Sequence, residues 1–147
     1  MTGGIEVQAL FCDEVRVETG GKVSAMGLYT GALLLPDPAD NPVDRLGIVV
    51  SAIWPREFRP DKIGIRFQLP RQELLQGDLR EALAGRLQEG ALAGSEAFRL
   101  LSSFNIRTVP LRPGDVIEVW LIVNEQALPA GRLHVQGAPT LQAAAVA

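Results

Sequence analysis

The sequence predicts a mainly β protein, an antiparallel two-sheet β-sandwich of the Ig-like or C2-like kind, with seven or eight strands and one inserted helix near residues 78–89. Short runs of alternating apolar and polar residues recur along the chain, and glycine and proline turns separate them. These strand-length runs are not each followed by a helix, which disfavours a parallel α/β fold. A closed β-barrel is the second choice.

Length and composition predict one domain. A chain of 147 residues with 47% hydrophobic and 21% charged residues is long enough to bury a core without a metal or a disulfide. We expect the domain to span residues 1–137 and residues 138–147 to form a flexible tail, because that segment has no strand-like pattern.

The charge balance and the single cysteine restrict the binding partners and the cellular location that we expect for the protein. A net charge of -3 gives no general attraction to nucleic acid, and no apolar run reaches membrane-spanning length. Cys12 has no partner for an intramolecular disulfide, and the first residues do not resemble a signal peptide. We therefore expect a cytoplasmic protein, and the excess of arginine over lysine suggests a bacterial, GC-rich genome.

The most informative stretch is residues 5–29, which predicts two strands folded about a glycine pair. Odd positions from Ile5 onward are apolar until Asp13 interrupts them. This carboxylate is either held on the buried face by hydrogen bonds or marks a bulge that turns the strand. We expect it to accept hydrogen bonds from Arg16, Tyr29 or backbone amides and so to fix the first hairpin.

The register of this hairpin has two solutions. A three-residue loop at 19–21 sets Glu18 beside Lys22 and Val17 beside Val23, whereas a two-residue loop sets Thr19 beside Lys22. The pairing of opposite charges favours the longer loop.

The remaining elements follow from periodicity and turn residues. Residues 46–54 are apolar at nearly every position, as in a central strand, and residues 62–69 alternate as in a half-buried strand. The helix at 78–89 has apolar residues at helical spacing, with Asp78 as its N-cap. Further strands are predicted at 33–35, 103–109, 116–124 and 132–136, with a Pro-Gly turn at 113–114 and a reversal that begins at Asn124.

Three segments, FCDEVRVETGGKVSAMGLY, IVVSAIW and PGDVIEVWLIVN, together resemble a group of small bacterial and phage-associated proteins of unknown function. The resemblance covers most of the chain, and the first segment is its distinctive part. It implies a compact β-sandwich and gives no catalytic residues.

The sequence contains no evident catalytic constellation or cofactor motif. His134 and Cys12 are the only imidazole and thiol, and the pattern predicts a solvated histidine and a structural cysteine. One residue of each kind cannot supply a zinc site with soft ligands alone, and no phosphate-binding glycine loop is present. Asp13 and Glu14 are neighbours on a strand and point to opposite faces. We therefore predict no catalytic residues, no metal and no cofactor.

One loop offers a weak signal for a cation. Asp37, Asp40 and Asp44 lie close together in the sequence, and Ca²⁺ prefers such oxygen ligands. The spacing is not that of an EF-hand, so the alternative is a solvated loop stiffened by proline.

The best candidate for a binding surface is the segment after residue 53. Trp54, Arg56, Phe58 and Arg59 combine aromatic and guanidinium groups between prolines, which is a composition typical of protein interfaces. The alternative is that Trp54 caps the core and the two arginines pair with nearby acids. Trp120 is ambiguous in the same way.

These observations predict a non-enzymatic β-sandwich module that contacts another protein or a second copy of itself. It would use a sheet face, an edge strand or the Trp54 loop. The alternative is a domain that binds a small molecule, a carbohydrate or a ligand through Ca²⁺.

Overall fold

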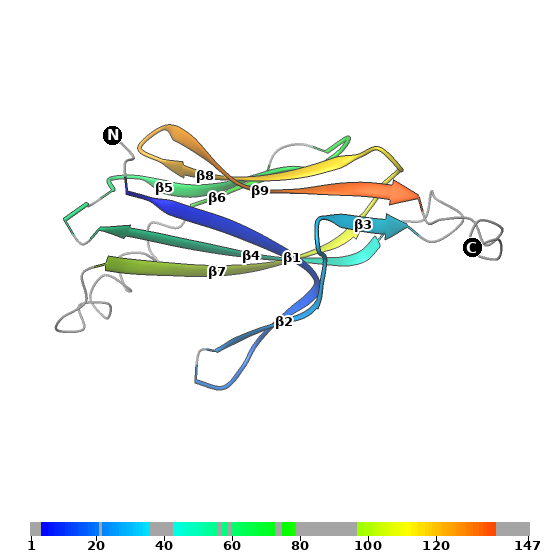
Figure 1. Ribbon diagram of the computed structural model, residues 1–147, viewed down its shortest axis with the longest axis horizontal. Helices are drawn as coiled ribbons and strands as arrows, with labels where there is room; N and C mark the ends of the chain where they lie inside the picture. Colours follow the sequence, from blue (N-terminus) through cyan, green and yellow to red (C-terminus); the bar gives the residue numbers. More distant parts are fainter. Residues whose placement is uncertain are drawn as a thin grey trace.

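The computed structural model describes residues 4–20, 22–35, 43–55, 57–58, 60–72, 75–78 and 97–137, which form nine strands in two sheets (Figure 1). Sheet A has the spatial order β2 (Val23–Leu28), β1 (Glu6–Val17), β4 (Val43–Pro55) and β7 (Ala97–Val109). Sheet B has the order β3 (Ala32–Leu35), β9 (Gln126–Gly137), β8 (Val116–Val123), β5 (Ile63–Gln68) and β6 (Leu75–Asp78).

The predicted mainly β class with two sheets is therefore confirmed. Each predicted strand is present, although β7 and β9 begin several residues earlier than their patterns indicate, and β6 was not predicted. The described residues contain no helix. The expected helix at 78–89 lies outside the described residues except for Asp78, which ends β6, and the expected tail lies outside them too.

One hydrophobic core lies between the sheets. Sheet A contributes Phe11, Ile48 and Val50, and sheet B contributes Ile65 and Leu121, all of them buried. Phe67 of β5 and Phe104 of β7 meet edge to face across the core, with ring centroids 4.9 Å apart. Strand β4 is central in sheet A, which explains why its sequence is apolar on both faces.

The expectation of purely antiparallel sheets is wrong at one edge. Strand β3 pairs in parallel with β9, from Ala32 beside His134 to Leu35 beside Gly137. Because side chains alternate along the strand, Leu33 and Leu35 both enter the core while Leu34 stays on the outside. All the other pairs of described strands are antiparallel.

Two local features shape the hairpin of β8 and β9. Asn124 and Glu125 both have positive φ, as a two-residue type I′ turn requires, and the Asn124 side chain accepts hydrogen bonds from the backbone of residues 61 and 62. The register then shifts by one residue, since Val119 faces Gly131 but Trp120 faces Pro129. Ala130 is therefore the extra residue of a β-bulge.

Strand β1 changes its surroundings midway along its length. It pairs with β4 from Glu6 to Cys12, and beyond Cys12 β2 is its one strand partner among the described strands. Ala9 and Phe11 face the core between the sheets, but Val15 joins a second, smaller cluster and Val17 is 72% exposed. The single buried face predicted for the odd positions is thus correct only up to Phe11, because the strand then bends away from the core between the sheets.

Asp13 lies at this bend. Its side chain is exposed, so the alternative of a buried carboxylate is wrong. The pairing with β2 continues across the bend without an inserted residue, from Cys12 beside Leu28 to Glu14 beside Met26. The predicted bulge is therefore absent from the β1–β2 ladder, and the strand bends at this point without one.

Candidate functional site

The β1–β2 hairpin, residues 13–28, leaves the edge of sheet A and extends below the two sheets in the view of Figure 1; we call it the arm. Its register matches the longer of the two predicted loops, because Val17 faces Val23 and the Glu18 amide donates to the Lys22 carbonyl at 2.6 Å. Large apolar side chains are exposed on it: Val17 by 72%, Met26 by 45% and Leu28 by 54%. Such exposure on neighbouring strands is typical of a contact surface.

A glycine allows the arm to lie over the outer face of sheet A. A Cβ atom at Gly47 of β4 would lie 2.7 Å from Cys12 Sγ and 2.9 Å from Val15 Cγ2, which is closer than real Cβ contacts. Cys12 and Val15 pack with Val49 in the second cluster, where Val23 and Leu101 also contact them. The absence of a side chain at Gly47 thus makes room for the base of the arm.

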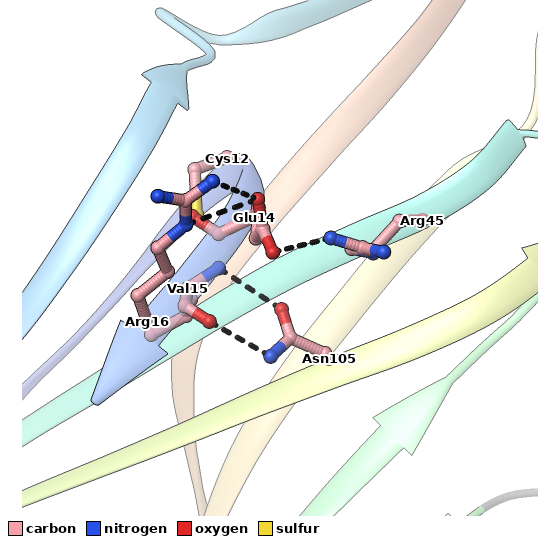
Figure 2. A network of polar contacts seen from close by, with 6 residues as sticks. All are labelled: Cys12, Glu14, Val15, Arg16, Arg45 and Asn105. Atoms are coloured by element: carbon pink, nitrogen blue, oxygen red, sulfur yellow. Dashed lines mark hydrogen bonds and ion pairs between the residues drawn. The ribbon is translucent and has the colours of Figure 1, made fainter. Parts of the chain in front are cut away.

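An asparagine of β7 takes the place of the missing strand partner. The Asn105 side chain donates from Nδ2 to the Val15 carbonyl and accepts from the Val15 amide, both at 2.9 Å (Figure 2). A side-chain amide can mimic a peptide group because it carries one acceptor and two donors. Asn105 therefore fixes the arm to a strand that is not its neighbour in sheet A.

Glu14 joins the arm to the central strand. Its carboxylate contacts Arg45 of β4 through one oxygen and Arg16 through the other, the latter at 3.4 Å (Figure 2). Arg16 therefore pairs with Glu14 and not with Asp13, which corrects that part of the sequence prediction. Both arginine side chains are well exposed, so these ion pairs orient the arm more than they stabilise it.

Tyr29 is the partner that Asp13 does have, as predicted. The phenol donates to Asp13 Oδ1 at 2.5 Å, and Tyr29 also packs against the main core. Burial raises the pKa of Tyr29, and the hydrogen bond and negative charge of Asp13 raise it further, so the phenol keeps its proton. Asp13 also lies over Gly27, whose φ of +71° and lack of a Cβ permit the close approach.

Cys12 and His134 lie on different sheets. Cys12 is fully buried, and burial raises the pKa of its thiol, which donates to the Glu14 carbonyl at 3.4 Å. His134 is exposed on β9, where Arg132 and Gln136 share the polar face. The structural cysteine and the solvated histidine were both predicted.

The predicted Trp54 surface is only partly described. Trp54 is 1% exposed and belongs to the main core, so the alternative that it caps the core is the observed one. Phe58 is half-buried against the same core, which leaves it little area for a partner. Arg56 and Arg59 lie outside the described residues.

The predicted cation loop also lies largely outside the described residues. Asp37 and Asp40 fall outside them, and so does the side chain of Asp44. The part of the chain that the structure describes contains no group of three metal-ligating side chains. No helix long and apolar enough to cross a membrane occurs in that part either.

A hollow of about 350 Å³ on the outer face of sheet B is the second candidate site. It is lined by residues of β8 and β9, namely Glu118, Val119, Trp120, Pro129, Ala130, Gly131 and Arg132. Glu118 and Arg132 form an ion pair at 3.6 Å on its rim. The β-bulge at Ala130 contributes to its lining, and Trp120 is half-buried there.

Sequence reasoning missed Asn105, Gly47 and the bulge at Ala130. Gly47 did carry a signal, since a glycine inside an apolar strand often marks a close approach of another segment. A scan against models of protein families finds none that matches this chain, and a search of curated proteins finds no similar sequence. The resemblance to bacterial and phage-associated proteins stays a prediction.

Proposed function

We propose that this chain is a non-enzymatic β-sandwich module, Ig-like or C2-like in kind, that contacts another protein or a second copy of itself through the arm. The observation that carries the proposal is the exposure of Val17, Met26 and Leu28 on one hairpin. Apolar side chains on neighbouring strands gain most when a partner removes them from water. A bacterial, cytoplasmic and phage-associated setting belongs to the same proposal.

The mode of contact is addition of a strand to the outer edge of β2. This strand is the last in the spatial order of sheet A, so one row of its backbone groups faces away from β1. Residues 23–28 contain no charged side chain and no proline, the residue types that protect edge strands from such pairing. An extended segment of a partner, or β2 of a second copy, can pair there through its backbone.

The base of the arm is held in place before any partner binds. Asn105, Glu14 and the cluster around Cys12 each fix a residue of β1 to β4 or β7. A contact surface that is already ordered loses less conformational entropy on binding. Met26 and Leu28, farther along β2, stay exposed.

Two leucines with the same exposure give a matched test. Leu28 of β2 and Leu34 of β3 are each 54% exposed, but only Leu28 belongs to the arm. Light scattering after size-exclusion chromatography, over a range of concentrations, measures self-association. We expect the protein to associate, Leu28→Arg to abolish association and Leu34→Arg to leave it unchanged.

If light scattering shows that the protein is monomeric, the contact to test is one with a different protein. The chain and both variants then serve as baits in cross-linking with cell extract, and we expect a partner that Leu34→Arg retains and Leu28→Arg loses. If both variants behave alike in both experiments, the arm is not the contact surface.

A further inference from the structure

The bulge at Ala130 creates the hollow on sheet B. In a regular ladder the residues of β9 facing Glu118 and Trp120 would be two apart, whereas here they are Arg132 and Pro129, three apart. The extra residue separates the two outward side chains of β9 and exposes the strand backbone between them. Four side chains from adjacent strands thus frame one concave patch.

Strand β9 also approaches β1 closely at this point. A Cβ atom at Gly131 would lie 2.9 Å from the Ala9 Cβ and 3.1 Å from the Ala9 carbonyl oxygen on the opposite sheet. The lack of a side chain lets the bulged segment sit deep between the sheets, and its outer surface is the floor of the hollow. The hollow is therefore built into the strand geometry and does not depend on a loop.

The chemistry of the hollow combines an aromatic face with a neutral polar rim. Trp120 supplies an indole whose π-face carries partial negative charge, which attracts the C–H groups of a ligand. Glu118 and Arg132 offer acceptors and donors, and their pairing leaves the rim without net charge. Pro129, the cross-strand partner of Trp120, adds an apolar side chain beside it.

We propose that this hollow binds a pyranose ring of a neutral saccharide. A pyranose has the matching surfaces, because its axial C–H groups form an apolar face and its hydroxyl groups lie around its edge. The ring stacks on Trp120, Glu118 accepts hydrogen bonds from its hydroxyls, and Arg132 donates to them. The volume of the hollow, about 350 Å³, also falls in the range of small-molecule sites, which begins at about 300 Å³.

This site is separate from the arm. The hollow lies on the outer face of sheet B and the arm extends from sheet A. A failure of saccharide binding therefore does not affect the proposed protein contact, and the reverse also holds.

Nuclear magnetic resonance tests the proposal, because the chain contains two tryptophans and hence two indole N–H signals. The probes are glucose, galactose, mannose and N-acetylglucosamine as methyl glycosides, each titrated to about 50 mM, where millimolar affinity is measurable. We expect at least one probe to shift the Trp120 signal. The Trp54 signal, from a buried core residue, should stay in place and serves as the internal control.

Variants separate stacking from hydrogen bonding. Trp120→Ala should weaken binding about tenfold, whereas Trp120→Phe, which keeps an aromatic face, should retain most of it. Glu118→Gln keeps the shape but loses the charged acceptor and should weaken binding by about threefold to tenfold. Gln68→Ala is the control, since Gln68 faces Glu118 from β5 but does not line the hollow.

The proposal is overturned if no probe shifts the Trp120 signal, or if Trp120→Ala and Gln68→Ala bind equally well. Thermal unfolding of each variant shows whether it is folded, and the Trp120→Phe variant keeps the test valid if Trp120→Ala is not.

Discussion

Replacing Asn105 by alanine tests whether the arm is held as a separate unit. The substitution removes two hydrogen bonds to Val15, both 2.9 Å long, and no strand of sheet A other than β2 pairs with Val15. Each such bond contributes about 0.5–1.5 kcal/mol net, so the arm should lose about 1–3 kcal/mol of local stability. The opening of the arm then becomes about fivefold to 150-fold more frequent.

Hydrogen exchange measured by mass spectrometry reads this effect segment by segment. Peptides from residues 13–28 should exchange faster in Asn105→Ala, and peptides from residues 46–54 of the central strand should change little. Ser103→Ala is the matched control, because Ser103 lies two residues away on the same strand. Equal acceleration in the arm and in β4, or the same effect from Ser103→Ala, would refute the idea that Asn105 acts on the arm alone.

Two further predictions concern packing and pH. Gly47→Ala places a Cβ atom 2.7 Å from Cys12 Sγ, so we expect the free energy of unfolding to fall by about 1–3 kcal/mol. The melting temperature should then fall by about 2–4 °C for each kcal/mol. An unchanged melting temperature would contradict the close packing. Asp115 accepts two hydrogen bonds from Arg71 and one from the Arg112 amide, and the Arg71 hydrogen bond lowers the pKa of Asp115. A carboxyl group whose pKa is lowered in the folded state stabilises the fold at pH values above its ordinary pKa. Asp115→Asn should therefore be less stable than the wild type at pH 7. Urea unfolding should show this difference in stability shrinking as the pH falls below about 4. A difference that stays constant down to pH 2 would mean that the charge of Asp115 contributes nothing.

Local patterns predicted most of the fold. The apolar run of β4, the alternation of β5 and the reversal at Asn124 each depend on neighbouring residues, and each is present. The register of the first hairpin also followed from a short-range pairing of Glu18 with Lys22.

What the sequence did not predict depends on contacts between distant residues. A four-residue strand such as β3 carries no signal that selects β9, and still less a parallel orientation. The burial of Val15 against the outside of sheet A depends on Gly47 and Asn105, which come from two other strands. For the same reason the proposed arm and hollow could not be identified from the residues of one strand, whereas the Asp13–Tyr29 contact, within one hairpin, was predicted.

The pairing of β3 with β9 imposes an order on folding. During synthesis, residues 32–35 leave the ribosome long before residues 134–137 are made. Leu33 and Leu35 therefore stay exposed to water until the strand that pairs with them is available. Closing so long a loop is slow compared with forming the hairpins on either side of it. The newly made chain therefore passes through a stage in which Leu33 and Leu35 are not yet covered by β9.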